Sequence, residues 1–212
     1  MLQARGSAWT GSARLALTGG PGSTDSAVLP GVLEWRVRPH WSGLAAQIKA
    51  QCCTTQALRL DIRPHWGGAT LLIADAATQW PAQVLSGLGT PWNTVQPEGD
   101  LALSTRGLSV EWNAGRVTVL GHAQLDALNI ASRLSTLRPM GSYRITINGA
   151  ATSTLQLETL DGSLQLTGSG QWVGARLRFN GIASAAPERA AALANLLNII
   201  GRRSGSKSII TL

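Results

Sequence analysis

Charged residues make up only 14% of this 212-residue sequence, and its aromatic residues are almost all Trp, with one Tyr and one Phe. Low charge together with 44% apolar residues excludes an intrinsically disordered chain. No stretch approaches the roughly 20 consecutive apolar residues of a membrane-spanning helix. A chain of this length buries ~70% of its unfolded surface, so it can fold without a disulfide framework or a metal. We therefore expect residues 1–212 to form a single domain.

The sequence has only two cysteines, Cys52 and Cys53, and they are adjacent. Such a pair either closes as a vicinal disulfide or remains two thiols, which excludes a structural disulfide framework. The CxxC spacings of zinc and redox sites are also missing, so the cysteines do not fix the compartment. A nucleophilic Cys52 would need a His partner and a lowered pKa, and the sequence indicates neither. We expect Cys52 to be a strand residue.

A period-two alternation of apolar and polar residues dominates the sequence, which is the pattern of strands with one buried face. The clearest examples are Leu33–Arg38 and Leu58–Arg63, where apolar residues alternate with polar ones. Strands are also expected around Leu101/Leu103, Leu108/Val110/Trp112, Val117–Leu125, Tyr143/Ile145/Ile147, Leu155/Leu157, Leu164/Leu166, Leu177/Phe179 and Ser208–Leu212. Because no helical pattern separates these strands, the sequence excludes a parallel α/β fold and predicts antiparallel hairpins.

Turns and two helices complete the predicted fold. Asn113–Gly115, Asn148–Gly149 and Asp161–Gly162 are expected to form hairpin turns, the last two by supplying positive φ. A short helix is expected from Pro81 to Ser86, and a second from Pro187 to Ile200 with its apolar stripe on the sheet. The prediction is a mainly β protein with a single curved antiparallel sheet, as a meander, half-pipe or barrel-like form, a short helix near 81–86 and a C-terminal helix near 187–200.

One short motif occurs twice. Arg36–Gly43 reads RVRPHWSG, and Asp61–Gly68, 25 positions later, reads DIRPHWGG. In each copy we expect a strand to end at Pro and the next to begin after Gly, with the Trp ring covering the sheet edge. The alternative is that His40 and His65 stand together as metal ligands, which is disfavoured because two imidazoles without acidic or thiol partners make a poor site.

The sequence contains no catalytic pattern. No Ser has Gly two positions before and two after it, as a nucleophile elbow requires. Gly19–Gly22 lacks the Lys-Ser/Thr of a phosphate loop and Gly168–Gly170 lacks the dinucleotide spacing, so both are expected to be loops. His122 stands alone and the 11 acidic residues are scattered, so only the fold could assemble a general acid–base pair. We assign no catalytic, cofactor-binding or metal-binding residue.

Positive charge prevails, since 18 basic and 11 acidic residues give a net charge of +7, and all basic residues except Lys49 and Lys207 are Arg. Nucleic-acid binders gather basic residues on one element with aromatic residues between them, whereas these Arg residues lie singly along strands. The densest cluster, Arg202–Arg203 with Lys207, follows a helix end, where the helix dipole favours cations. We expect no nucleic-acid partner, but a mild attraction to an anionic membrane surface or an acidic partner.

Seven segments resemble the type II secretion system protein N family, also called general secretion pathway protein N. They are Gly6–Gly11, Leu29–Trp35, Leu88–Asn93, Ser132–Tyr143, Gly168–Trp172, Leu196–Arg203 and Ser208–Ile210. No single segment is chemically diagnostic, but their order and spacing together extend over nearly the whole chain. Family members begin with a short cytoplasmic segment and one inner-membrane helix, whereas Met1–Gly6 opens directly into an alternating pattern. We expect that N-terminal anchor to be absent from this chain.

The resemblance implies an accessory subunit of the machine that moves folded proteins from the periplasm across the outer membrane of Gram-negative bacteria. It implies a periplasmic domain of an inner-membrane protein, with no enzymatic activity, no cofactor and no catalytic residues. The implied partners are other type II secretion subunits, namely the inner-membrane platform proteins or the periplasmic part of the secretin.

Two other functions stay open. Bent antiparallel sheets also form the grooves of periplasmic lipid-carrying proteins, and a helix at 187–200 that plugs the concave side would weaken this alternative. An enzyme acting on cell-envelope glycans would need two carboxylates, such as Glu111 and Asp126, ~5–10 Å apart. The terminal strand Ser208–Leu212 could also pair with a partner's strand, although pairing within its own sheet is the favoured role.

Overall fold

The computed structural model describes residues 2–18, 26–90 and 92–211, so the expected loop Gly19–Gly22 and the expected strand end Leu212 lie outside the described residues. Its helices are η1 (Ala82–Leu88) and η2 (Pro187–Arg189), both 3₁₀, and α1 (Trp92–Val95) and α2 (Ala190–Ile200). Its strands are β1 (Leu2–Gly6), β2 (Thr10–Arg14), β3 (Ala16–Thr18), β4 (Ser26–Val28), β5 (Leu33–His40), β6 (Gly43–Ala50), β7 (Leu58–His65), β8 (Gly68–Ile73), β9 (Ala76–Pro81), β10 (Pro97–Asn113), β11 (Arg116–Ser132), β12 (Gly141–Gly149), β13 (Thr154–Gly162), β14 (Leu164–Val173), β15 (Arg176–Ala185), β16 (Arg202–Ser204) and β17 (Lys207–Thr211).

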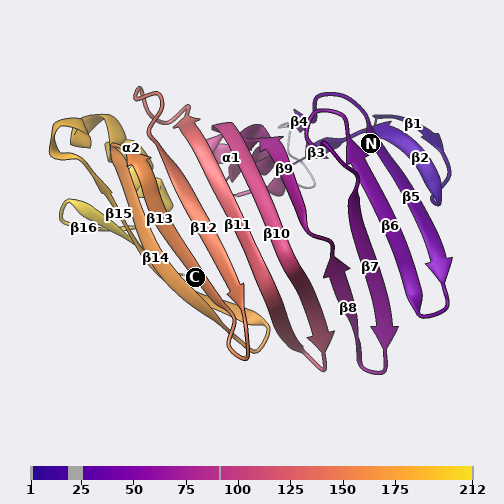
Figure 1. Cartoon of the computed structure of the whole chain (residues 1–212). Coiled ribbons are helices and arrows are strands. Elements are labelled where there is room, and N and C mark those ends of the chain that lie inside the picture. Colours follow the sequence, from indigo (N-terminus) through magenta and orange to yellow (C-terminus); the bar gives the residue numbers. More distant parts are fainter. Residues whose placement is uncertain (1, 19–25, 91, 212) are drawn as a thin grey trace.

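Fifteen of these strands form one antiparallel sheet (Figure 1). Their order is β1-β2-β5-β6-β7-β8-β10-β11-β12-β13-β14-β15-β17-β16, with β9 beside β10, while β3 and β4 pair separately. Most neighbours in the sheet are also neighbours in the sequence, which is the predicted meander. The sheet is not closed, since β1 and β16 form its two ends. β17 lies between β15 and β16 and thus pairs within its own sheet, the favoured role.

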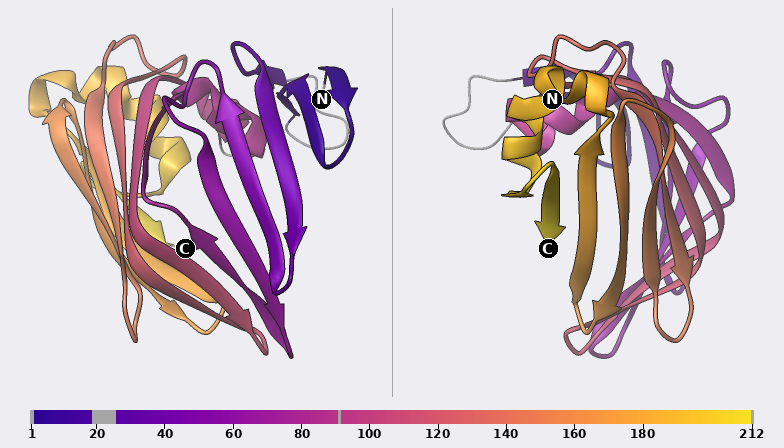
Figure 2. Two further views of the ribbon diagram at one scale, coloured as in Figure 1. Left: turned by 45° about the vertical axis from the view of Figure 1, so that its right-hand side comes forward. Right: turned by 90° about the vertical axis from the view of Figure 1, so that its left-hand side faces the viewer.

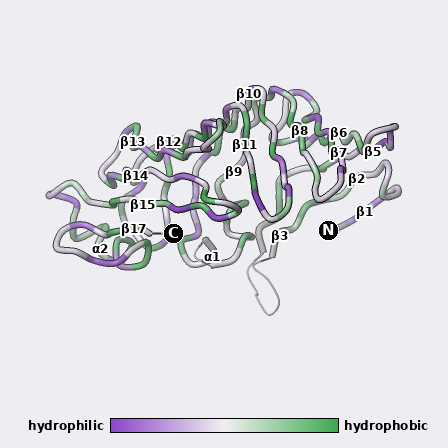
Figure 3. The backbone as a smooth tube through the Cα atoms, turned by 90° about the horizontal axis from the view of Figure 1, so that it is seen from below, coloured by the Kyte–Doolittle hydropathy of each residue, from purple (hydrophilic) through white to green (hydrophobic). Residues whose placement is uncertain are grey.

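The sheet is bent into an arc, with α1 and α2 on its concave side (Figures 2 and 3). Alternate side chains of a strand point to opposite faces, so the strand pairing shows which residues share a face. Leu60 pairs with Ala46 on one side and with Ile73 on the other, which continues the apolar row from strand to strand. The neighbouring Arg59 and Asp61 point to the convex face. The same row continues through Leu71 and Val110 to Val119 of β11, and alternate residues of β11 lead to Ala127, whose partner Tyr143 packs under α2, so the apolar face is the concave one.

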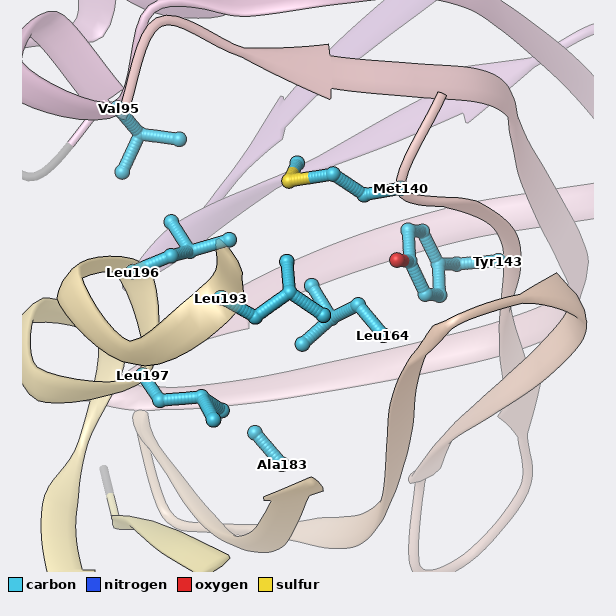
Figure 4. Close-up of a cluster of buried hydrophobic side chains, with 8 residues drawn as sticks. All are labelled: Val95, Met140, Tyr143, Leu164, Ala183, Leu193, Leu196 and Leu197. Atoms are coloured by element: carbon cyan, nitrogen blue, oxygen red, sulfur yellow. The ribbon is translucent and has the colours of Figure 1, made fainter. Parts of the chain in front are cut away.

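The best-packed part of the concave face lies under α2 (Figure 4). Leu193, Leu196 and Leu197 of this helix are at most 2% exposed. They pack in one cluster with Val95, Met140, Tyr143, Leu164 and Ala183. The Ser208 hydroxyl donates a hydrogen bond to the Leu197 carbonyl at 2.6 Å, which fixes the end of the helix to β17. The predicted C-terminal helix and its contact with the sheet are confirmed.

The short helix and the repeated motif require corrections. The helix predicted over Pro81–Ser86 is a 3₁₀ helix from Ala82 to Leu88, because Pro81 still pairs with β10 as the last residue of β9. The strands predicted to end at Pro39 and Pro64 continue by one residue to His40 and His65. Each proline stands one residue from the strand end, where a missing N–H disturbs the ladder least.

Glycine positions were also partly misassigned. Gly168–Gly170 is not a loop but the middle of β14. A Cβ at Gly168 would lie 2.4 Å from Cζ of the buried Phe179, so glycine makes room there for an aromatic ring of the next strand. Gly149 ends β12 without the predicted positive φ and the turn runs through 150–153, whereas Gly162 has the predicted positive φ of 118°.

A second, smaller core lies between the C-terminal end of β6 and the helix η1. Leu29, Ala50 and Cys53 are buried there, with Leu15, Trp80 and Val84 packed against them. Cys53 is bonded to Cys52 as a vicinal disulfide in the turn after β6. Cys52 is therefore a turn residue and not the predicted strand residue, because the chain must reverse here to place β7 beside β6.

Candidate functional site: an open apolar face

The apolar face continues well beyond the area that α2 covers. This helix contacts β15, β16 and β17, at the C-terminal end of the sheet. Among residues 2–18, 26–90 and 92–211, the second core covers this face only near Ala50 at the end of β6, and the rest of the concave face of β5–β8 and the adjoining part of β10 has no such cover. We call this surface the open apolar face. It consists of Trp35, Val37, Leu44, Ala46, Ile48, Leu58, Leu60, Ile62, Leu71, Ile73, Val110 and Trp112.

The open apolar face is accessible to solvent and contains no charged side chain. Leu44 and Ile62 are direct cross-strand partners and are 37% and 38% exposed, and Trp112 is 44% exposed. The remaining members are partly buried. Contiguous exposed apolar surface on this scale usually marks an interaction site rather than a folding core.

Charged residues of the same strands lie on the convex face. Asp126 of β11 and Arg144 of β12 form its best-defined ion pair, with Nε–Oδ1 and Nη2–Oδ2 distances of 2.7 and 2.8 Å. The hydrogen bond from Arg144 lowers the pKa of Asp126; partial desolvation opposes this shift, and the Arg144 charge and a hydrogen bond from Gln124 add to it. The pair joins two strands and has no reactive partner, so its role is structural.

His40 and His65 each lie beside a different carboxylate. His40 Nε2 lies 2.9 Å from Asp61 Oδ2, and His65 Nε2 lies 3.9 Å from Glu111 Oε1. Desolvation acts to raise the pKa of Asp61, but the hydrogen bond and charge of Arg63, together with His40, hold it below its usual value. Nowhere in the described part of the chain do three His, Cys, Asp or Glu residues gather as metal ligands would.

The carboxylates proposed for glycan hydrolysis are not a pair. Glu111 lies opposite Thr118 in the β10–β11 hairpin, and Asp126 lies opposite Ala102. Nine residues of β10 separate these two positions, which corresponds to roughly 30 Å along the strand. That distance excludes the ~5–10 Å arrangement of a glycosidase. His122 is likewise engaged in a structural contact, with its Nδ1 2.9 Å from Asn148 Oδ1.

Sequence reasoning identified the residues of the open apolar face as strand residues but did not identify their exposure. The alternation shows that one face is apolar. The sequence pattern is the same whether a helix packs on that face or solvent reaches it. By its fold, the chain is therefore a mainly β protein built on one open, curved antiparallel sheet, part of whose concave face is apolar and exposed.

One of the comparisons with known proteins identifies the family of the chain. The family model for type II secretion system (T2SS), protein N matches residues 1–209, and the chain belongs to this family. The resemblance in the seven segments is thereby confirmed, and with it a role in type II secretion. No curated protein and no solved structure matches the chain. Within the described residues, none of the helices is long and apolar enough to cross a bilayer.

Proposed function

We propose that this chain is a non-enzymatic accessory subunit of the type II secretion system that acts by binding other subunits through its open apolar face. The continuous sheet supports treating residues 1–212 as one domain. We place this domain in the periplasm, tethered to the inner membrane, where the platform proteins and the periplasmic part of the secretin are within reach. It then contributes to the export of folded proteins across the outer membrane by protein–protein contacts.

The observation that carries this proposal is the contrast between the two halves of the concave face. Under α2 the apolar residues are buried by the chain's own helix, whereas Leu44 and Ile62 are left more than one-third exposed. Exposing such residues costs solubility, and a partner that covers them gains ~25 cal/mol per Å² of apolar area removed from water.

The test is a pull-down with the purified periplasmic domains of the platform proteins and the secretin. The variant Leu44→Asp/Ile62→Asp places two charges on the open apolar face and should abolish capture. The matched control is Leu120→Asp, which makes the same change at a residue 48% exposed on the convex face and should leave capture intact. Equal capture by both variants would refute the assignment of this face.

A second candidate function is favoured by the same geometry. Because α2 does not reach the open apolar face, this curved apolar surface suits acyl chains, so the chain could bind or carry a periplasmic lipid. Native mass spectrometry of the purified protein separates the two functions. A retained lipid mass that Leu44→Asp/Ile62→Asp removes, without subunit binding by the unmodified chain, would replace the accessory function with a carrier function.

A further inference from the structure

The two copies of the repeated motif place fully exposed Trp residues at adjacent hairpin turns. Trp41 lies in the β5–β6 turn and Trp66 in the β7–β8 turn, and both side chains are 100% exposed or more relative to a reference residue. The expectation that these rings cover the sheet edge is therefore wrong. A large apolar ring with no packing partner is unfavourable in water, so a role in binding is the physical reason to place two of them here.

These turns belong to one end of the sheet. The β5–β6, β7–β8 and β10–β11 turns all lie at the lower edge in Figure 1. We call Pro39–Gly43, Pro64–Gly68 and Asn113–Arg116 together the tip rim. The backbone N–H of Ala114 donates to the Gly67 carbonyl at 3.1 Å, which joins two of the turns. Since the β5–β6 and β7–β8 hairpins are neighbours, two strand spacings place their turns about 10 Å apart across the sheet.

The histidines of the motif hold the turns and leave the indole rings free. The Ser42 N–H lies 3.4 Å from His40 Nδ1, so the other ring nitrogen of His40 can donate to Asp61. In the second copy, His65 Nδ1 lies 3.3 Å from the carbonyl oxygen of Trp66. In each copy of the Pro-His-Trp sequence, the His side chain contacts the turn and the Trp side chain projects into solvent.

Basic side chains slightly outnumber acidic ones beside the tip rim. Arg38 and Arg63 precede the two prolines and are exposed, and Arg116 closes the third turn. The nearby carboxylates are Asp61 and Glu111. Asp61 pairs with Arg63 at 2.5 Å and contacts His40, so the Asp61–Arg63 pair adds no net charge, and Glu111 Oε1 lies 3.9 Å from His65 Nε2. The whole chain also carries a net charge of +7, so it is attracted to anionic surfaces.

From these observations we infer that the tip rim docks on the surface of an anionic lipid bilayer, with Trp41 and Trp66 at headgroup level and neighbouring Arg side chains near lipid phosphates. Trp is enriched at membrane interfaces because its ring is apolar and its N–H is polar, and basic residues add attraction to anionic lipids. Two rings on separate protruding turns fit a fluid interface, which adapts to both, whereas a protein partner would need two matching pockets. This contact is distinct from the open apolar face and does not depend on the proposed function.

The inference is tested by flotation with vesicles of phosphatidylglycerol and phosphatidylcholine, compared with vesicles of phosphatidylcholine alone. The unmodified chain should bind the anionic vesicles more strongly and lose binding as salt rises. The variant Trp41→Ala/Trp66→Ala should weaken partitioning roughly tenfold or more, because both rings leave the interface. Brominated lipid should quench the fluorescence of the unmodified chain, and most of this quenching should disappear in the double variant.

The matched control is Trp92→Ala in α1, near the opposite end of the sheet, where the side chain is 40% exposed (Figure 1). This variant should bind vesicles as the unmodified chain does, and Trp41→Phe/Trp66→Phe should recover part of the lost binding. Absence of binding to anionic vesicles, or equal binding by the double Ala variant, overturns the inference. If the unmodified chain binds no vesicles and the double Ala variant no longer captures a secretion subunit in the pull-down, the tip rim is a protein-binding surface instead. The variant Leu44→Asp/Ile62→Asp should retain vesicle binding. The vesicle assay therefore tests the membrane contact separately from subunit binding by the open apolar face.

Discussion

The contact between α2 and the sheet gives the sharpest prediction for stability. Leu196 is 2% exposed and packs in the cluster with Val95 and Met140, so Leu196→Ala removes buried methyl groups and leaves a cavity. Such a change costs ~3 kcal/mol of the free energy of unfolding, within a range of about 2–5. In a chain of this length, 1 kcal/mol corresponds to a Tm change of about 2–4 °C. We therefore expect Leu196→Ala to lower Tm by about 6–12 °C, measured by circular dichroism at the strand signal and checked by urea unfolding.

The same helix provides the control. Ile199 is 43% exposed, and Ala is a better helix former than Ile, so Ile199→Ala should shift Tm by no more than about 2 °C. A loss below about 1 kcal/mol for Leu196→Ala, or equal losses for the two variants, would show that α2 is not packed on the sheet. The whole concave face would then be open, and the argument for a binding surface confined to β5–β8 and β10 would fail.

Three further changes probe other parts of the molecule. Asp126→Asn should cost about 1 kcal/mol at neutral pH through loss of the Arg144 ion pair. Because folding lowers the pKa of Asp126, its ion pair stabilises the fold above the unfolded pKa, and this stabilisation is lost as pH falls through the folded pKa. The urea midpoints of the variant and the unmodified chain should therefore converge below pH ~4. A constant difference between them would contradict this prediction. Gly68→Ala should destabilise by about 2–3 kcal/mol in urea unfolding, since its Cβ would lie 1.7 Å from the Trp112 carbonyl oxygen, and an unchanged midpoint would disprove that close approach. Tyr143→Phe should leave Tm unchanged or raise stability by up to ~1 kcal/mol, because the buried hydroxyl has no hydrogen-bond partner in the described chain; a clear drop in Tm would reveal a partner.

The sequence was sufficient for the long strands and their antiparallel hairpins because alternation is a local signal, whereas β3, β4, β9, β16 and the strand order were not predicted. Leu101/Leu103 and Leu108–Trp112 were both recognised as strand, although they belong to the single 17-residue strand β10. What joins them is a register irregularity between Arg106 and Ser109, and the alternation alone does not show whether a break in its phase is a turn or a bulge. The hairpins follow from local pattern, whereas strand order and strand length depend on tertiary pairing.

Glycine and Trp show the limits of prediction most clearly. The Gly-Ser-Gly sequence at 168–170 is typical of a loop. Glycine is needed at 168, however, because the ring of Phe179 from the adjacent strand fills the space of a side chain there. Likewise, the hydropathy of Trp41 predicts burial, whereas its place at a protruding turn leaves it in solvent. In both cases the deciding neighbour is defined only by the three-dimensional pairing, so no reading of the local segment could have supplied it.

The meander order also determines where the sheet unfolds locally. Because most strand pairs are local in sequence, each hairpin can form without first closing a long loop, as in quasi-one-dimensional repeat proteins. Three neighbouring pairs, β2–β5, β8–β10 and β15–β17, are not consecutive in sequence. Of these strands, β10 has the most neighbours, since it is bordered along its length by β11 and on its other side by β9 at Asp100–Thr105 and by β8 at Leu108–Asn113. Fraying therefore proceeds inward from β1 and β16, and amide protection against hydrogen exchange rises toward the β10–β11 hairpin.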